Sequence, residues 1–349
     1  GYTIVMSSNR FSTLGNGLNA KLGVKQHQFG IELGSSTVRM VCNGAIRSEQ
    51  PSVVLQHTQP GTNPAMGSQS LQGLRSKPVV VKGVVADVQA AQTLLYTILS
   101  ALPEAPSFLT RYTGWCVIPS ASTQVEKDLF LDSLPKIPWI SWKLLPKTQL
   151  YQSTVTKIFA DTGMQSIIDI GADTTEFSVV SHQENDTTQL SETLYWGTRD
   201  LEQMLQMLIR DLYQVQLSPD AFTKVFLQLS EELFSAKTSL KASFAVRAQS
   251  LATGRPVTIT LKAQDLQPAF LEWFEYLTLG LQVILHRNRT LGVSSALEQG
   301  IVVVGGGATI ADIVPALSDF FTVPTTTVPE PRLWLVKGLQ LLTKKSSAS

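Results

Sequence analysis

One stretch of sequence decides the fold of this chain: Ile167-Ile168-Asp169-Ile170-Gly171-Ala172-Asp173-Thr174-Thr175-Glu176-Phe177-Ser178-Val179-Val180. Its pattern predicts an apolar strand, a tight polar turn that contains a glycine and two threonines, and a second apolar strand. A turn of this kind directs backbone N–H groups and hydroxyls at one point, which suits phosphate oxygens. Asp169, at the end of the first strand, suits a hydrated Mg²⁺ ion. The stretch therefore predicts a hairpin whose turn holds a phosphate group.

A second hairpin of the same kind lies near the N-terminus. It runs Phe29-Gly30-Ile31-Glu32-Leu33-Gly34-Ser35-Ser36-Thr37-Val38-Arg39-Met40-Val41, and Glu32 stands where the other hairpin has Asp169. One such hairpin is weak evidence, but two acid-x-Gly turns about 140 residues apart indicate an internal repeat. We therefore expect two related halves that close on one nucleotide.

A run of three glycines adds a third element to this pattern. In Ile301-Val302-Val303-Val304-Gly305-Gly306-Gly307-Ala308-Thr309-Ile310, a buried strand runs into the glycines and then into a helix. Glycine lets a backbone approach a flat base or sugar closely, and a helix N-terminus favours anions. Alone, the run is typical of any strand-to-helix turn. Together with the two hairpins it predicts contact with a nucleoside.

Composition limits the possible classes of protein. A chain of 349 residues with 43% hydrophobic residues suggests about two domains. Charged residues make up only 16%, below the ~25% of typical soluble domains, which favours self-association. The net charge of +1 argues against a general nucleic-acid binder. Cys42 and Cys116 lie in apolar runs and are expected to be buried thiols, and no apolar run is long enough to span a membrane.

Strand-like and helix-like runs alternate along the chain, which predicts an α/β architecture of two similar halves. We expect a flexible N-terminal arm over 1–27, a first domain over 28–163, a second domain over 164–343 and a disordered tail over 344–349. The apolar residues of 264–286 recur at helical spacing and predict a buried core helix.

At this point the chain resembles the superfamily of actin, the sugar kinases and the chaperone ATPases. The two hairpins are similar to its two phosphate loops, and the glycine run is similar to its adenosine loop. Within that superfamily the chain most resembles MreB, the bacterial actin. The matching segments occur in the same order as in MreB from about residue 29 to residue 343: Gln50–Val54 (EPSVV in MreB), Lys82–Asp87 (DGVIAD), Cys116–Glu126, Ser250–Pro256, Pro329–Pro331 and Val336–Gly338.

The resemblance implies an actin-like fold, with two related domains around a central cleft that binds ATP or ADP with Mg²⁺. It implies that the C-terminal helix returns to the first domain, and that Asp87, a local cap or packing residue by sequence, lies near the cleft. It assigns the metal to Glu32 and Asp169. It assigns nucleotide contacts to Gly34, Ser35, Ser36, Gly171, Ala172, Thr174, Thr175, Gly197, Lys237, Gly305, Gly306 and Gly307.

Two departures from the family pattern concern the phosphate loops. Glu32 replaces the usual Asp and is one methylene longer, which would displace a Mg²⁺-bound water. Asp173 replaces a usual Gly. A carboxylate at that position would repel phosphate oxygens unless it turns away.

Further departures concern hydrolysis. Leu144-Leu145-Pro146 occupies the place of the family's E-E-P segment, whose Glu positions the attacking water. Gln149 and Gln152 are the nearest polar candidates, but their spacing is wrong. One helix of the family contacts the ribose with a Glu and a Lys. This chain has Phe234 in place of that Glu and retains the Lys as Lys237, and Trp196–Arg199 replaces the family's G-G-D segment. Because phosphoryl transfer depends on positioning and charge, we expect nucleotide binding with slow or lost hydrolysis.

The resemblance thus implies a cytoskeletal protein that assembles head to tail with itself into filaments at the inner face of the cytoplasmic membrane. It would act in cell shape or with scaffold proteins. Phe108 and Leu109, in the loop 106–112, either contact a bilayer or tuck against their own domain. The alternative is a non-polymerising adaptor of the PilM or FtsA type that binds a component of a membrane machine, because Gly30–Val38 and Asp169–Ala172 also resemble PilM. Filaments or monomers in Mg-ATP discriminate the two.

Overall fold

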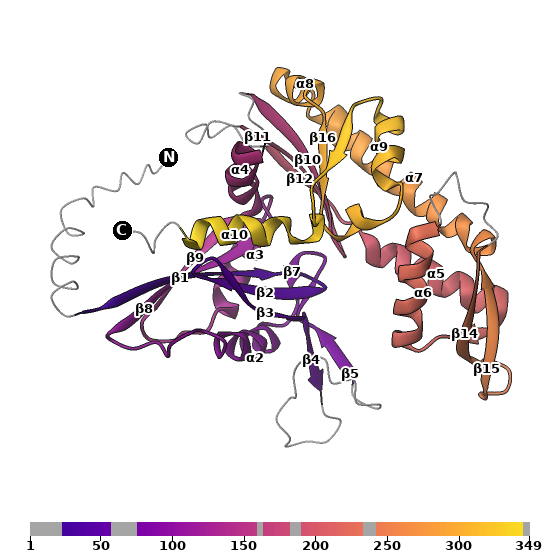
Figure 1. The fold of residues 1–349 in the computed structure, drawn as a ribbon, viewed down its shortest axis with the longest axis horizontal. Coiled ribbons are helices and arrows are strands. Elements are labelled where there is room, and N and C mark those ends of the chain that lie inside the picture. Colours follow the sequence, from indigo (N-terminus) through magenta and orange to yellow (C-terminus); the bar gives the residue numbers. More distant parts are fainter. Residues whose placement is uncertain (1–22, 57–74, 159–162, 182–189, 233–241, 345–349) are drawn as a thin grey trace.

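Two five-stranded sheets with the same arrangement form the framework of the molecule (Figure 1). The computed structural model describes residues 23–56, 75–158, 163–181, 190–232 and 242–344. Within these residues each half of the chain contributes one of the two sheets, and helices pack against both. The predicted α/β architecture is confirmed.

The first sheet has the strand order β3-β2-β1-β8-β9. Its strands are β1 (Lys25–Leu33), β2 (Thr37–Cys42), β3 (Ala45–Pro51), β8 (Thr110–Ile118) and β9 (Ile140–Pro146). β1 pairs antiparallel with β2 and parallel with β8, and β8 pairs parallel with β9. The apolar faces of α2 (Val88–Leu99) and α3 (Gln124–Ser133) share a core with this sheet.

The second sheet repeats this plan with the order β12-β11-β10-β16-β17. Its strands are β10 (Met164–Ile170), β11 (Thr175–Ser181), β12 (Leu190–Leu194), β16 (Ile301–Val304) and β17 (Thr325–Thr327). β10 pairs antiparallel with β11 and parallel with β16, as β1 does with β2 and β8. The internal repeat inferred from the two hairpins is therefore present in the sheet topology.

The remaining elements surround these sheets. The strands are β4 (Val53–Gln56), β5 (Arg75–Pro78), β6 (Val80–Val81), β7 (Val84–Val85), β13 (Val215–Gln216), β14 (Ser243–Ser250) and β15 (Pro256–Lys262). The helices are α4 (Lys147–Ile158), α5 (Thr198–Tyr213), α6 (Pro219–Glu232), α7 (Ala263–Arg287), α8 (Leu291–Glu298), α9 (Ile313–Phe321) and α10 (Trp334–Lys344), with short 3₁₀ turns η1 (Gly306–Thr309) and η2 (Pro331–Leu333). The sheet β13-β14-β15 lies with α5 and α6 at one end of the molecule, on the right of Figure 1.

A middle layer of two helices, α4 and α10, lies between the two sheets (Figure 1). Its core mixes apolar side chains from both halves with Leu150, Tyr151 and Leu339 of the two helices. Helix α10 approaches β1 closely, because a Cβ on Gly30 would lie 2.4 Å from Leu339 Cδ2. The C-terminal helix therefore packs on strands formed some 300 residues earlier.

Four local predictions can be compared with the structure: the buried cysteines, the core helix, the absence of a membrane span, and the two chain ends. Cys42 and Cys116 are free and buried, as predicted. The predicted core helix is α7, which begins at Ala263 and ends at Arg287, and Trp273 within it is fully buried. None of the described helices is long and apolar enough to cross a membrane. The predicted arm and tail lie outside the described residues, except that β1 begins at Lys25 and α10 ends at Lys344.

Candidate functional site

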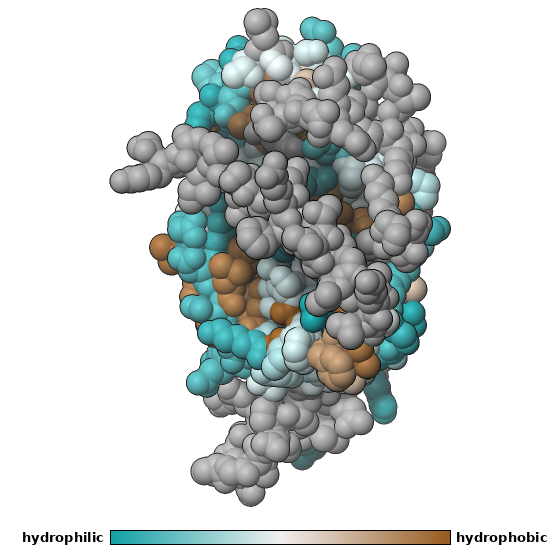
Figure 2. All heavy atoms as spheres, turned by 90° about the vertical axis from the view of Figure 1, so that its left-hand side faces the viewer, coloured by the Kyte–Doolittle hydropathy of each residue, from teal (hydrophilic) through white to brown (hydrophobic). Residues whose placement is uncertain are grey.

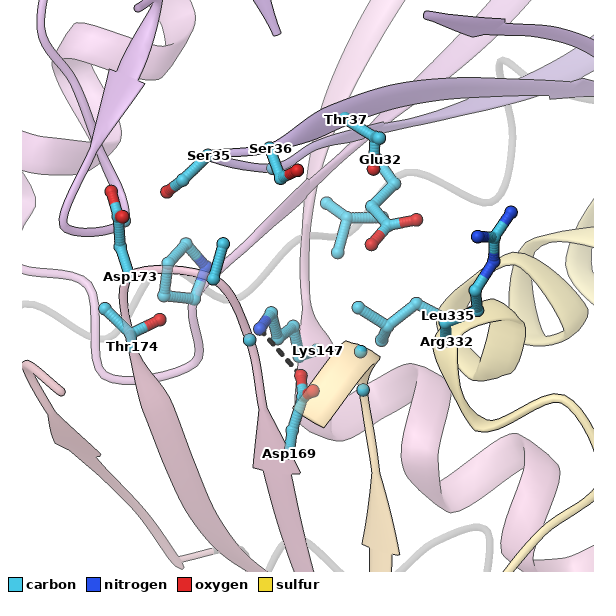
Figure 3. A pocket seen from close by; sticks show the side chains of 18 of the residues that line it. Glu32, Ser35, Ser36, Thr37, Lys147, Asp169, Asp173, Thr174, Arg332 and Leu335 are labelled. Carbon is cyan, nitrogen blue, oxygen red and sulfur yellow. Dashed lines mark hydrogen bonds and ion pairs between the residues drawn. The ribbon is translucent and has the colours of Figure 1, made fainter. Parts of the chain in front are cut away.

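A cavity of about 260 Å³ opens where the two halves face each other. Its walls come from both hairpin turns, the start of α4, the first two glycines of the glycine run, and the η2–α10 junction. Figure 3 shows Glu32 and Ser35 to Thr37 of the first hairpin on one side, and Asp169, Asp173 and Thr174 of the second on the other. The cavity therefore brings together the two motifs that the sequence repeats.

The two hairpin turns have the same backbone geometry. In the first, the Gly34 N–H donates to the Thr37 carbonyl at 3.0 Å, and in the second, the Gly171 N–H donates to the Thr174 carbonyl at 2.9 Å. A Cβ added to either glycine would lie 3.0 Å from that same carbonyl oxygen. The shared bond explains why both turns have glycine directly after the strand end.

The second turn presents N–H groups on one side. The carbonyls of Gly171 and Ala172 accept hydrogen bonds from the backbone N–H groups of Thr198 (3.0 Å) and Arg199 (2.8 Å) at the start of α5. A trans peptide directs its C=O and N–H in opposite directions. The N–H groups of Ala172 and Asp173 therefore lie on the side away from α5, and both residues line the cavity. Such adjacent N–H groups bind anions.

The first turn is held in a comparable way. The Ser36 carbonyl accepts from the Ser52 N–H at 2.9 Å, and the Ser35 carbonyl accepts from the Arg199 guanidinium at 2.9 Å. By the same planarity argument, the N–H groups of Ser36 and Thr37 point away from these donors. Both turns thus keep backbone donors for a ligand while their carbonyls are occupied.

The three glycines of the run differ in their surroundings. Gly305 has φ +87°, and a Cβ there would lie 2.3 Å from Asp169 Oδ1. A Cβ on Gly307 would lie 2.2 Å from Ile170 Cγ2, so both glycines are required by packing against β10. Gly306 lines the cavity and faces open space, since no heavy atom of the described residues, apart from its chain neighbours, lies within 4 Å of its ideal Cβ position. Gly306 is therefore the glycine that leaves room for a ligand.

The acid of the first hairpin is paired with a buried cation. Glu32 Oε2 lies 3.1 Å from Arg39 Nη1, its cross-strand neighbour, and Arg39 Nη2 lies 3.4 Å from Glu49 Oε1. Arg39 is 5% exposed. Burial raises the pKa of Glu32 above its ordinary value, and Arg39 opposes that rise. The carboxylate of Glu32 is therefore already committed within its own hairpin.

The acid of the second hairpin is paired with a lysine from another element. Asp169 Oδ2 accepts from Lys147 Nζ at 2.8 Å (Figure 3). It also accepts from the Tyr151 hydroxyl at 2.6 Å. Lys147 Nζ also lies 3.8 Å from Glu176, the buried cross-strand neighbour of Asp169. Burial works to lower the pKa of Lys147, but Asp169 and Glu176 outweigh it and raise that pKa above its ordinary value. Lys147 is therefore a cation that holds two acids together.

Asp173 does not present an unpaired charge to the cavity. It is 3% exposed, and its carboxylate lies 2.6 Å from Arg199 Nη1 and accepts from the Lys82 backbone N–H at 2.8 Å. Lys82 belongs to the β6–β7 turn of the first half, and its ammonium reaches Asp200 of the second half at 3.0 Å. The repulsion expected from this acid is relieved by pairing, and the pairing connects the two halves.

Other predicted residues support the cavity from outside it. The Thr175 hydroxyl donates to the Trp196 carbonyl at 2.8 Å, and Gly197 packs so tightly under Ala172 that a Cβ would lie 2.3 Å from the Ala172 carbonyl oxygen. Gln149 is exposed on α4 and Gln152 is nearly buried, and neither lines the cavity. Lys237 and Phe234 lie outside the described residues.

Sequence reasoning missed three site residues: Arg39, Lys147 and Tyr151. Arg39 carried a signal, because a charged residue within the apolar strand Thr37–Cys42 needs a buried partner. Lys147 carried a weaker one, since it follows Pro146 at the end of an apolar strand and begins a helix, where positive charge is unfavourable.

The donor set does not fit a metal ion. Glu32 and Asp169, the two acids assigned to Mg²⁺, are paired with Arg39 and Lys147. In the part of the chain that the structure describes, no group of three or more His, Cys, Asp or Glu side chains could hold a metal. A divalent cation at either acid would meet a resident positive charge.

Comparisons with known proteins agree with this geometry. The family model described as MreB/Mbl protein matches residues 26–349. The cell shape-determining protein Mbl of Bacillus cereus is 21% identical over 334 residues, which covers 90% of this chain and 94% of that protein.

Two solved structures share the fold. The crystal structure of MreB5 of Spiroplasma citri bound to ADP has a TM-score of 0.78 at 20% identity, covering 92% of this chain and 97% of that chain. A MamK double helical filament has a TM-score of 0.73 at 18% identity, covering 91% and 98%. These structures confirm the predicted actin-like fold. Because the family model matches almost the whole length of this chain, the chain belongs to the MreB/Mbl family.

Proposed function

We propose that this chain is an MreB-type cytoskeletal protein that binds an adenine nucleotide between its two halves and assembles into filaments. One observation supports this most: two turns that share the same glycine N–H to threonine carbonyl hydrogen bond leave backbone N–H groups for a ligand in one cavity. In the similar solved structures, MreB5 is bound to ADP and MamK forms a double helical filament. The family match makes the same two properties the natural expectation here.

The cavity suits a nucleotide in its parts. The phosphates would lie against Ser36, Thr37, Ala172 and Asp173, where backbone N–H groups are left for a ligand. The nucleoside would lie against Gly306, which has open space above it. Arg332, which lines the same wall, is half-exposed and pairs with Glu49 at 3.3 Å.

We further propose that hydrolysis is slow or absent. Leu145, in the segment where the family has its water-positioning acid, is buried and apolar. Each acid that lines the cavity is paired: Glu32 with Arg39, Asp169 with Lys147 and Asp173 with Arg199. None of them is available as a general base. Phosphate release from ATP should stay at or below about 10⁻³ s⁻¹, as in NTPases without a complete catalytic set.

A membrane contact is the finer part of the proposal. Ser107 and Thr110 exchange backbone hydrogen bonds of 2.8 and 3.1 Å, which fixes a tight turn with Phe108 and Leu109 at its tip. Phe108 is 61% exposed and Leu109 40%, so the pair is not tucked against its own domain. On the face shown in Figure 2, the coloured apolar side chains form separate patches among hydrophilic ones. An exposed apolar tip favours contact with the inner face of the cytoplasmic membrane.

The test combines binding with imaging. ADP binding is measured by calorimetry, and the full chain is imaged by negative-stain electron microscopy with and without nucleotide. Binding together with filaments supports the proposal. Binding with monomers across salt and protein concentration would contradict the polymer and favour a PilM- or FtsA-like adaptor. Failure to bind ADP in every buffer would overturn the nucleotide site itself.

A further inference from the structure

We propose that the Lys147 ammonium replaces the divalent cation of this site, so that the chain binds nucleotide phosphates without a metal ion. This inference rests on the proposed nucleotide site and assigns the source of its positive charge. It follows from three observations: the position of Lys147 between two acids, the balance of paired charges that line the cavity, and the partial exposure of the Lys147 side chain.

The position of Lys147 is that of an ion shared between acids. Its ammonium lies 2.8 Å from Asp169 and 3.8 Å from Glu176, which face each other across the β10–β11 hairpin. Two carboxylates opposed in this way repel unless a cation lies between them. Glu32 of the first hairpin also acts electrostatically on the same ammonium. Lys147 thus meets the acids of both halves from one point.

The charges that line the cavity are already balanced. Three acids line it (Glu32, Asp169 and Asp173), and so do three bases (Arg39, Lys147 and Arg332). Mg²⁺ at a phosphate site is held by one or two protein carboxylates together with the phosphates, so its site has a carboxylate that carries no other cation. Here an incoming Mg²⁺ would have to share Asp169 with Lys147 or Glu32 with Arg39, against the charge of the resident cation.

The Lys147 side chain lines the cavity and is partly exposed. The Lys147 side chain is 19% exposed, whereas its partners Asp169 and Glu176 are 6% and 2% exposed. An ammonium has three donors, and among the described residues the structure gives Lys147 Nζ a single hydrogen bond, to Asp169. A phosphate oxygen can therefore accept a hydrogen bond from Lys147 while the ion pair with Asp169 stays intact. A metal ion bound by protein carboxylates coordinates a phosphate in the same way.

The first test uses the unaltered chain. ADP is titrated by calorimetry in excess EDTA and in Mg²⁺, and adenosine is titrated in the same buffers. We expect ADP affinities within about threefold of each other in the two buffers. ADP binding that requires Mg²⁺ would overturn this inference and leave the proposed nucleotide site standing. No ADP binding in either buffer would instead overturn the nucleotide site.

The second test removes the charge. In EDTA, Lys147→Met should bind ADP at least about tenfold more weakly, the loss of one charged hydrogen bond, while adenosine affinity stays unchanged. Mg²⁺ should restore part of the ADP affinity, because Asp169 and Glu176 are then free of the ammonium. Lys136→Met, which makes the same change at an exposed loop position outside the cavity, should match the wild type.

Two results would give Lys147 a merely structural role and overturn the inference: equal losses for ADP and adenosine, or an unchanged ADP affinity. Lys147→Arg retains the charge and should keep ADP binding in EDTA. If Lys147→Met does not fold, the comparison of EDTA with Mg²⁺ in the wild type still decides the question.

Discussion

At the scale of single residues, the two related hairpins neutralise their strand-end acids differently. Glu32 faces Arg39 in the cross-strand register, so the first hairpin supplies its own cation. Asp169 faces Glu176, so the second hairpin needs a cation from elsewhere, and Lys147 supplies it. Removing one partner of a buried pair leaves a charge without compensation, which costs more than the pair contributes.

Arg39→Leu is therefore expected to destabilise the fold by about 3 kcal/mol in urea unfolding at neutral pH. Burial already raises the pKa of Glu32, so its ionisation weakens the folded state as pH rises above the ordinary carboxyl pKa. Without Arg39 the free-energy cost of an ionised Glu32 in the folded state grows. This cost falls at low pH, because Glu32 is then protonated. The double variant Glu32→Gln/Arg39→Leu should recover part of the loss, and Arg47→Leu, at an exposed position on β3, should lose little. Equal losses for the single and double variants would contradict this account.

Gly306→Val is expected to block the ligand and leave the fold intact. Its ideal Cβ position has no neighbour within 4 Å, so the side chain enters the cavity and not a packed core. ADP affinity should fall at least about tenfold in calorimetry, with little change in the thermal midpoint. Gly163→Val, whose Cβ position is equally open but lies outside the cavity, is the matched control. Unchanged ADP binding by Gly306→Val would show that the nucleoside does not approach the glycine run.

At the scale of elements, Asp87 is the N-cap of α2. Its carboxylate accepts from the Ala90 N–H at 2.9 Å and also pairs with Lys77. The bond to Ala90 and the pairing with Lys77 hold the pKa of Asp87 below its ordinary value. A depressed carboxyl pKa contributes stability above the unfolded-state pKa, and that stability is lost as pH falls through the folded-state pKa.

Asp87→Ala should thus cost about 1 kcal/mol at neutral pH, and the difference from the wild type should shrink below about pH 4. Asp87→Asn keeps an acceptor at the cap and removes the titration, so its stability relative to Asp87→Ala should not depend on pH. Denaturant unfolding at a series of pH values measures both. A gap between wild type and Asp87→Ala that stays constant down to pH 3 would count against the cap as the cause.

Local signals explain why some elements could be predicted and others could not. The two turns and the Asp87 cap rest on residues within a few positions of one another, so the sequence pattern predicts them. The Glu32–Arg39 pair also follows from the hairpin register once the turn is placed. Lys147 and Asp169 lie on a helix and a strand whose contact depends on packing of the middle layer, and no spacing rule joins them. The Arg199–Asp173 pair likewise required the approach of α5 to the turn.

At the scale of the whole molecule, polar contacts cross the cavity and tie the halves together. Lys82 reaches Asp200, and its backbone N–H reaches Asp173. Arg199 bridges further, from Asp173 in the second half to the Ser35 carbonyl in the first. These contacts hold the two halves against each other around the cavity, in the arrangement that we call closed. A ligand that binds only the closed state gains affinity from these contacts, and loses it when they are removed.

The last prediction concerns this closure. Spin labels on Tyr96→Cys of α2 and Met207→Cys of α5 sit at exposed positions on opposite halves, and native Cys42 and Cys116 are buried. Burial raises the pKa of Cys42 to about 11 and that of Cys116 to about 12, so labelling is selective.

Lys82→Met, which removes a partly exposed ion pair, should broaden the label distance distribution and weaken ADP binding by up to about fivefold. Arg199→Met should broaden the distance distribution further, because it also removes the cation that pairs with the buried Asp173. Saturating ADP should narrow the distance distributions of both variants again. Distributions identical to the wild type in both variants would mean that the apolar middle layer alone holds the halves closed.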